Sequence, residues 1–274
     1  MPPLQTPRFG QNLRRGGQRM DMGLQGKVIV ITGAGSGIGR ACAQLARAEG
    51  ADHLVLTDRD APGLAATASD LSAHAVLADL STPPGARAVT DQTLARYGRI
   101  DGLINAAGLT TRGSVATGDM AVWDQLFAVN ARAPFLLMQA AVADLLARRA
   151  PGAIVNILSM NAHCGAPDLA IYAATKGAMA TLTRNAAHAH MADRIRVNAV
   201  NLGWVATEAE DHMQAVTLGH GPDWQAKAAA GLPLGRMVTA LESARLAIYL
   251  LGEASVPISG SVVDLEQFVA GAIR

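Results

Sequence analysis

Short apolar runs alternate with helical patterns along most of the chain. The runs are rich in β-branched side chains and predict strands at 27–32, 53–57, 74–78, 102–105, 153–158, 195–200 and 261–264. The run at 27–31, Lys-Val-Ile-Val-Ile, shows no alternation with polar positions, which is typical of a strand buried on both faces of a sheet. Helical segments separate the runs, so the pattern predicts an α/β fold, a doubly wound parallel sheet of about seven strands with helices on both faces.

A glycine-rich turn follows the first predicted strand. Residues 32–39 read Thr-Gly-Ala-Gly-Ser-Gly-Ile-Gly and lead into a segment of good helix formers. Glycines in such a turn allow positive φ angles and let backbone N–H groups approach a pyrophosphate, whose charge the helix N-terminus also favours. The order of strand, turn and helix predicts a nucleotide site, with a merely flexible loop as the alternative. The residues expected to contact the nucleotide in this turn are Gly33, Ser36, Gly37, Ile38 and Gly39.

The second predicted strand ends at an acidic residue. Asp58 follows the last glycine of the turn by about 20 residues, where a carboxylate binds the ribose hydroxyls of NAD. That carboxylate would repel the 2′-phosphate of NADP, whereas the neighbouring Arg59 could attract it. NAD is therefore the favoured coenzyme and NADP the alternative, while an ordinary turn residue is the other interpretation of Asp58.

A phenol, an ammonium and a hydroxyl are spaced for proton transfer. Tyr172 and Lys176 stand four residues apart in a helical segment, and Ser159 lies upstream, just past the apolar run at 153–158. Residues four apart share one face of a helix, and the lysine charge would favour a phenolate whose pKa is otherwise near ~10. The serine could hold a substrate oxygen by a hydrogen bond. A tyrosine and a lysine with this spacing also occur by chance, so the pair needs support from other motifs.

One helical segment contains a proline that leaves a carbonyl without its partner. Pro134 follows Asn130 by four residues and has no N–H to donate to the carbonyl of Asn130. The segment predicts either a kinked core helix or a polar group placed for a function.

Together these motifs resemble the classical short-chain dehydrogenase/reductase family over about residues 25 to 265. The turn at 32–39 matches the coenzyme turn of that family, and Asn-Ala-Ala-Gly at 105–108 matches its second signature. The resemblance implies a single-domain Rossmann-type fold, NAD(P)-dependent oxidation of alcohols or reduction of ketones, and assembly as a homotetramer or homodimer. It also implies a catalytic tetrad, which would consist of Asn130, Ser159, Tyr172 and Lys176.

The resemblance assigns further contacts by position. Asp79 and Leu80 would contact the adenine ring, and Asn105, Ala106 and Ala107 would lie along the adenine ribose. Lys176 would hydrogen-bond the nicotinamide ribose and lower the pKa of Tyr172, the general acid/base. The carbonyl of Asn130 would hold a water that relays protons, and Ser36 stands where phosphate-binding members often carry a basic residue. Val205 and Thr207 would lie near the nicotinamide carboxamide.

Two segments depart from the family pattern. Asn-Leu-Gly at 201–203 replaces the frequent Pro-Gly pair, so the loop over the carboxamide is expected to differ in detail. After Asp264 the chain continues with Leu-Glu-Gln-Phe in place of Asp-Gly-Gly, which changes what is expected of the substrate pocket or subunit contacts.

Composition narrows the classes of partner. A chain of 274 residues, 50% of them hydrophobic, can bury one substantial core, which places a single domain at 23–274. The net charge of +1 offers no basic patch for nucleic acid, and no stretch of 18 apolar residues suggests a membrane span. With only two cysteines and no zinc spacing, the chain predicts a cytoplasmic protein without a metal, acting on a small alcohol or ketone.

Two segments lie apart from the sheet pattern. Residues 1–22 have no apolar core and predict a disordered tail or an upstream start before Met20 or Met22, with an arm that bridges an oligomer as the alternative. The glycine- and proline-rich segment at 208–235 predicts a mobile lid over the site. The candidates for contact with substrate are Asn161, His163, Trp204 and Trp224.

The predicted function is interconversion of a secondary alcohol, such as a polyol or sugar, and a ketone by hydride transfer. One alternative is a non-catalytic NAD(H)-binding sensor, against which the intact Ser159, Tyr172 and Lys176 speak. Another is an NAD-retaining epimerase or dehydratase, which would normally need a larger C-terminal substrate domain.

Overall fold

A seven-stranded parallel sheet forms the centre of the molecule in the computed structural model, which describes residues 20–271. The expected tail at 1–22 therefore falls almost entirely outside the described residues. The strand order is β3-β2-β1-β4-β5-β6-β9. All seven predicted strands are present, with ends that move by at most two residues: β1 (Val28–Thr32), β2 (His53–Asp58), β3 (His74–Leu77), β4 (Gly102–Asn105), β5 (Gly152–Ser159), β6 (Ile195–Leu202) and β9 (Val262–Leu265).

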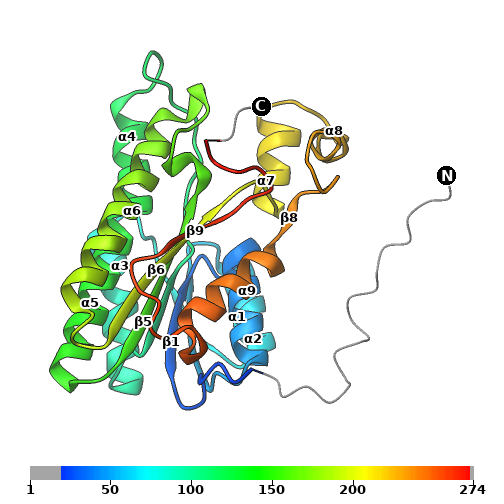
Figure 1. Cartoon of the computed structure of the whole chain (residues 1–274). Helices are drawn as coiled ribbons and strands as arrows, with labels where there is room; N and C mark the ends of the chain where they lie inside the picture. Colours follow the sequence, from blue (N-terminus) through cyan, green and yellow to red (C-terminus); the bar gives the residue numbers. More distant parts are fainter. Residues whose placement is uncertain (1–19, 272–274) are drawn as a thin grey trace.

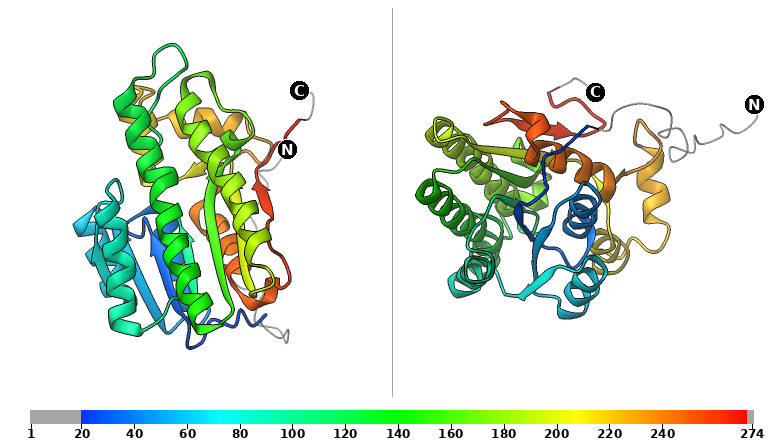
Figure 2. Two further views of the ribbon diagram at one scale, coloured as in Figure 1. Left: turned by 90° about the vertical axis from the view of Figure 1, so that its left-hand side faces the viewer. Right: turned by 90° about the horizontal axis from the view of Figure 1, so that it is seen from below.

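Helices cover both faces of the sheet, as Figures 1 and 2 show. One face carries α1 (Gly37–Ala48), α2 (Ala61–Leu71) and α9 (Ala240–Leu251), and the other carries α3 (Pro83–Tyr97), α5 (Ala133–Arg148) and α6 (Ala170–His190). The side chains of β1 explain this arrangement. Ile29 and Ile31 enter the core under the first set of helices, whereas Val28 and Val30 enter the core under the second. A strand buried on both faces needs apolar residues at every position, which accounts for its unbroken run.

The order in which the chain adds strands reverses at β1, and this reversal determines where the site lies. The chain builds outward from β1 through β2 to β3, then crosses to the other side of β1 to add β4, β5 and β6. Ligands of open α/β sheets bind at such a switch point, beyond the carboxyl ends of the strands. Because the strands are parallel, Thr32, Asp58, Asn105 and Ser159 all reach that same edge.

A long helical run passes along the second face. It joins α4 (Met120–Phe127) to α5 through a π-helical turn at Ala128–Arg132. Among residues 20–271, this run of 29 residues, Met120–Arg148, has the length and composition to cross a membrane, and its most apolar 18-residue window has a mean hydropathy of 1.4. Every 18-residue window of this run includes Arg132, so the run does not contradict the expectation that the sequence has no stretch of 18 apolar residues. Moreover, 56% of its most apolar window is buried in the protein, where α5 packs against α3 and the sheet, as the core helix of a soluble protein does.

A small lid, defined here as residues 208–235, lies beside the carboxyl edge of the sheet (Figure 1). It contains α7 (Glu208–His212), a π-helical turn (Met213–Thr217) and α8 (Trp224–Ala230). The short strands β7 (Val205–Ala206) and β8 (Val238–Thr239) flank the lid and pair with each other in parallel. These two strands were not predicted, because two-residue strands leave no periodic pattern in a sequence.

Candidate active site

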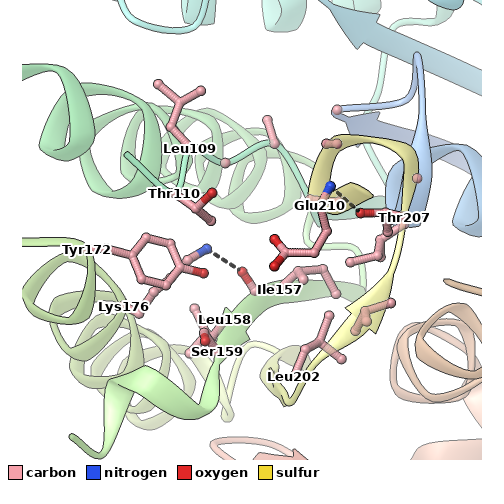
Figure 3. A pocket seen from close by; sticks show the side chains of 18 of the residues that line it. Leu109, Thr110, Ile157, Leu158, Ser159, Tyr172, Lys176, Leu202, Thr207 and Glu210 are labelled. Carbon is pink, nitrogen blue, oxygen red and sulfur yellow. Dashed lines mark hydrogen bonds between the residues drawn. The ribbon is translucent and has the colours of Figure 1, made fainter. Parts of the chain in front are cut away.

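A cavity of about 670 Å³ follows the carboxyl edge of the sheet from β3 to the lid. Its walls come from the glycine turn, the ends of the central strands, the start of α6 and the lid, part of which is drawn in Figure 3. Most of the predicted site residues meet there: Gly33, Ser36, Gly37, Ile38, Gly39, Asp58, Arg59, Asp79, Leu80, Ala106, Ala107, Ser159, Asn161, Tyr172, Lys176, Trp204, Val205 and Thr207. Residues far apart in sequence therefore form one site.

The glycine turn is packed too closely for side chains. Gly33 has a φ of +67°, and a Cβ there would lie 2.8 Å from the backbone nitrogen of Ala107. A Cβ on Gly39 would lie 2.2 Å from the carbonyl oxygen of Gly33. The hydroxyl of Thr32 accepts hydrogen bonds from the N–H groups of Ala106 and Ala107, both at 3.0 Å, and so ties the turn to the end of β4. This close approach leaves backbone N–H groups and the N-terminus of α1 beside the cavity, which fits the pyrophosphate of a dinucleotide.

Asp58 is held in place at the far end of the cavity. One carboxylate oxygen accepts from the N–H of Gly35 at 2.9 Å, and the other accepts from the N–H of Asp60 at 3.0 Å. Arg59 and Asp79 line the same end of the cavity. A hydrogen bond from the Ser81 N–H lowers the pKa of Asp79, so this carboxyl is ionised at neutral pH. Two fixed acidic groups therefore face the position expected for the adenosine.

The predicted proton-transfer residues lie together at the opposite end. Lys176 Nζ is 5.6 Å from the centre of the Tyr172 ring, and both residues lie on the first half of α6. Ser159 ends β5, and its hydroxyl accepts hydrogen bonds from the backbone N–H of Asn161 at 3.2 Å and from its side-chain amide at 3.1 Å. Ser159, Tyr172 and Lys176 are all buried, at 8%, 8% and 6% exposure. The three groups thus line one wall, as Figure 3 shows.

Burial has the largest effect on the pKa values of Tyr172 and Lys176. It raises the pKa of Tyr172 to about 12, although a hydrogen bond with the Ser159 hydroxyl works in the opposite direction. Burial also lowers the pKa of Lys176 to about 8. The ammonium donates a hydrogen bond to the Ile157 carbonyl at 3.0 Å, and its charge is not among the causes that lower the pKa of Tyr172. The expected lowering of the tyrosine pKa by this lysine is therefore wrong for the protein in this state.

Asn130 supports the site from behind and does not line the cavity. Its side-chain oxygen accepts from the N–H of Leu109 at 2.8 Å, and its amide donates to the carbonyl of Leu109 at 2.9 Å and to the Thr175 hydroxyl at 3.2 Å. The π-helical turn surrounds Asn130, and Pro134 has no N–H for its carbonyl, as the sequence indicated. The side chain thus fixes the loop after β4.

Asn105 also lies behind the cavity wall. It is 3% exposed, and its side-chain amide donates to Asn156 at 2.8 Å, linking β4 to β5. Its predicted contact with the adenine ribose is not made by a side chain that faces the cavity; the neighbouring Ala106 and Ala107 do line it.

Two of the substrate candidates lie elsewhere. His163 does not line the cavity, because its ring nitrogen Nε2 lies 3.0 Å from a carboxylate oxygen of Asp264 on β9. Trp224 is 3% exposed inside the lid, and its indole N–H donates to Asp211 at 2.7 Å. Sequence spacing does not reveal which residue a side chain will contact in the folded protein. Here the contacts with Asp264 and Asp211 determine where His163 and Trp224 lie.

The cavity also contains residues that the sequence did not reveal. Glu210 and Gln214 enter from the lid, and Arg112 enters from the loop after β4, where its Nε lies 3.3 Å from Asp168. They stand in segments without periodicity, so no local signal distinguishes them from ordinary surface residues. Across residues 20–271, no group of three or more His, Cys, Asp or Glu side chains is arranged to hold a metal ion.

A glycine turn at the switch point of a parallel sheet, joined by one cavity to a Ser, Tyr and Lys set, defines a nucleotide-dependent oxidoreductase. The family model described as enoyl-(acyl carrier protein) reductase matches residues 33–266. The chain therefore belongs to the classical short-chain dehydrogenase/reductase family, and it is an enzyme that acts on CH–OH groups.

Several similar proteins are named as dehydrogenases or reductases. The chain is 36% identical to 2-(S)-hydroxypropyl-CoM dehydrogenase 3 of Xanthobacter autotrophicus over 89% of this chain and 96% of that one. It is 32% identical to 2-keto-3-deoxy-L-fuconate dehydrogenase of Xanthomonas campestris over 85% of this chain and 76% of that one. The crystal structure of L-sorbose reductase from Gluconobacter frateurii, complexed with NADPH and L-sorbose, superposes with a TM-score of 0.86 at 29% identity, covering 93% of this chain and all (100%) of that one.

Proposed function

We propose that the enzyme interconverts a secondary alcohol and a ketone with NAD as coenzyme and Tyr172 as the general acid/base. The observation that carries this proposal is the single cavity that has Asp58 at one end and Ser159, Tyr172 and Lys176 at the other. A dinucleotide has the length and the polarity to connect these ends. When bound, its nicotinamide accepts or supplies the hydride at the carbinol carbon.

The residues of the cavity support NAD over NADP. Asp58 keeps its carboxylate in place through two backbone hydrogen bonds, so it cannot easily turn away from a 2′-phosphate. Ser36 carries no positive charge that would attract one. Arg59 lines the same end and is the group that would have to neutralise a phosphate if NADP were used. The L-sorbose reductase structure contains NADPH, so the preference must be tested on this chain.

In alcohol oxidation, the Ser159 hydroxyl donates a hydrogen bond to the substrate oxygen and Tyr172 takes the proton from it. For this step the phenol must lose its own proton, which its pKa of about 12 opposes. Lys176 assists if its ammonium turns from the Ile157 carbonyl toward the phenol and the coenzyme ribose. The carbonyl of Asn130, which Pro134 cannot satisfy, provides an acceptor for a proton path behind the lysine.

The names of the relatives support a small hydroxylated substrate, since they refer to 2-(S)-hydroxypropyl-CoM, 2-keto-3-deoxy-L-fuconate and L-sorbose. We propose a polyol, sugar or similar secondary alcohol, with the enzyme working in the cytoplasm as a homotetramer or homodimer. Neither a nucleic acid nor a membrane is part of the proposed activity.

A panel of secondary alcohols and ketones, assayed with NAD(H) and NADP(H) at the nicotinamide absorbance, tests this function against Tyr172→Phe. The variant lacks only the hydroxyl, so we expect kcat to fall by about 10³-fold while the dissociation constant for NADH changes by less than about twofold. Normal turnover by the variant would disprove the role of Tyr172. Coenzyme binding without turnover of any panel member by the wild type would favour a nucleotide sensor.

A further inference from the structure

The substrate end of the cavity contains more negative than positive groups. Besides Tyr172, the titratable side chains that line it are three carboxylates, Asp168, Glu210 and Glu266, and two cations, Arg112 and Lys176. Arg112 pairs with one of the carboxylates, because its Nε lies 3.3 Å from Asp168, although this buried N–H has no hydrogen-bond partner among residues 20–271; its Nη1 donates to the Thr110 carbonyl at 3.0 Å. The remaining carboxylates, Glu210 and Glu266, have no cationic side chain among the ion pairs of residues 20–271. This end is therefore rich in hydrogen-bond acceptors.

Glu210 is the carboxylate directed at the reacting groups. It projects from α7 into the cavity, and Figure 3 shows its carboxylate facing the wall that carries Tyr172 and Lys176. After burial, which has the largest effect, the negative charge of Glu210 adds to the raised pKa of Tyr172, while the charge of Arg112 acts in the opposite direction. A substrate held against Tyr172 must therefore lie near Glu210.

The lid holds Glu210 by only one of its two oxygens. Oε1 accepts hydrogen bonds from the indole N–H of Trp204 at 2.8 Å and from the side-chain amide of Gln214 at 2.7 Å. Gln214 is itself buried at 5% exposure, and its carbonyl oxygen lies 2.9 Å from Nδ1 of His220, so its amide group is oriented toward Glu210. Within the described part of the chain, Oε2 has no hydrogen-bond partner. A fixed carboxylate with one free oxygen in a cavity is a site for a hydrogen-bond donor.

We propose that Glu210 determines substrate specificity: its free oxygen accepts a hydrogen bond from a substrate hydroxyl near the reacting carbinol, so the enzyme takes neutral polyols and ketoses and disfavours anionic ones. This inference rests on the proposed function and narrows its substrate class. The carboxylate attracts a hydroxyl donor through a charge-assisted hydrogen bond and repels a carboxylate on the substrate. Hydroxyl groups of a polyol can donate hydrogen bonds to Oε2 in place of solvent. A carboxylate on the substrate has no hydrogen to donate, so it would leave the negative charge of Glu210 without a partner.

A matched pair of ketones isolates this effect. L-Sorbose and 5-keto-D-gluconate share their carbon skeleton and hydroxyl configuration, and they differ only in whether one end is a hydroxymethyl group or a carboxylate. For the wild type we expect kcat/KM to favour L-sorbose by about tenfold or more, the usual effect of one charge-assisted hydrogen bond. In Glu210→Gln we expect this ratio to fall to within about threefold of one, mainly through a higher KM for L-sorbose.

The glutamine variant separates specificity from lid structure. Its amide oxygen can still accept from Trp204 and Gln214, so the lid should stay folded while the charge is lost. Losing that charge also lowers the pKa of Tyr172, so the pH dependence of alcohol oxidation should move to lower pH. Glu208→Gln is the matched control, because it removes the same charge from the same helix at a side chain that does not line the cavity. At saturating NADH, this control should keep the wild-type substrate ratio.

The possible results distinguish this inference from the proposed function. A wild-type preference for 5-keto-D-gluconate, or an unchanged ratio and pH profile in Glu210→Gln, would overturn the role of Glu210 while leaving the oxidoreductase assignment intact. If neither ketone were turned over, dissociation constants from the protein–NADH complex would be measured by nicotinamide fluorescence. Tighter binding of L-sorbose that is lost in Glu210→Gln would still support the role, and equal binding of the two ketones to the wild type would refute it.

Discussion

The two ends of the cavity are built in different ways. At the coenzyme end, backbone groups and glycines form most of the wall. They belong to segments that follow neighbouring strands of the sheet. At the substrate end, side chains form the walls, and they come from the lid and the loop after β4 as well as from α6 and the end of β5. A backbone-built site tolerates little change because it depends on atoms that every residue shares. A site made by side chains on loops can change its specificity while the scaffold remains the same.

Lys176, which lies where the two ends meet, should show the largest energetic effect. Its buried ammonium has a pKa of about 8, compared with 10.5 for a free lysine. Below pH 8 the lysine is charged in both the folded and unfolded states, so its burial costs the folded state about 3 kcal/mol. Between pH 8 and 10.5 only the unfolded state is protonated, so the free energy of unfolding rises with pH and the cost disappears.

Lys176→Met removes this cost and should therefore be more stable than the wild type at pH 7, by up to about 3 kcal/mol, while losing turnover. The gain in the free energy of unfolding should shrink to zero as the pH rises toward 10.5, where the wild-type lysine is neutral in both states. Urea unfolding at several pH values measures this difference. Tyr172 is present in both proteins, and Lys176 is not among the causes of its raised pKa, so its ionisation contributes equally to both free energies of unfolding and cancels in the difference. A constant difference across the pH range would contradict the explanation by burial.

At the coenzyme end, Gly39→Ala should cost about 2 kcal/mol, because its Cβ would approach the Gly33 carbonyl oxygen to 2.2 Å and the turn would have to move. Thermal unfolding and NADH binding should both weaken. Gly177→Ala is the matched control in α6, since the nearest atom to its Cβ, at 3.7 Å, leaves room for a methyl group. The control should be neutral or slightly stabilising because alanine favours a helix. Equal effects of the two changes would show that the glycine turn is not tightly packed.

Asp58→Asn probes the same end with a smaller expected effect. Removing the negative charge should raise kcat/KM with NADP by about tenfold and lower it modestly with NAD, since the repulsion of a 2′-phosphate is lost. The ratio of the two coenzymes in steady-state assays is the measurement. Asp91→Asn, which removes a charge from the exposed side of α3, should leave the ratio as it is. A loss of activity with both coenzymes would instead indicate that Asp58 mainly shapes the turn through Gly35.

At the substrate end, Trp204→Phe should have the smallest effect. Phenylalanine keeps the aromatic contact with Trp224, whose ring centre lies 5.6 Å away, but removes the N–H donor to Glu210. KM for the substrate should rise a few-fold, consistent with the loss of one hydrogen bond of about 1 kcal/mol, while NADH binding stays unchanged. The same replacement at Trp123, which stacks on Phe127 in α4, should leave KM unaltered. Weaker NADH binding in Trp204→Phe would show that the two ends are coupled.

The contrast between the two ends also explains how far the sequence could predict the structure. The strands and the glycine turn were predictable because buried β-branched runs and glycine spacing are local patterns. Tyr172 and Lys176 were predictable because a helix fixes residues four apart on one face. Glu210 was not, since its position depends on Trp204 and Gln214, and no local rule brings those side chains together.

Ionisation was the least predictable property. Spacing indicated that Lys176 would lower the pKa of Tyr172, but spacing does not reveal how deeply both side chains are buried or that the Ile157 carbonyl accepts the lysine hydrogen bond. His163 illustrates the same limit, because its position four residues after Ser159 suggested the pocket while Asp264 holds it outside.

The Asn130 side chain connects two segments, the loop at Leu109 and helix α6 at Thr175. Its side-chain amide and oxygen bond both polar backbone atoms of Leu109, on the loop that leads to Arg112, and the amide also donates to the Thr175 hydroxyl, next to Lys176 on α6. Aspartate could not supply the donor and leucine could supply neither bond. A change in the outer part of this loop, near Arg112, therefore leaves the anchor at Leu109 in place, whereas a change at Asn130 releases the whole loop.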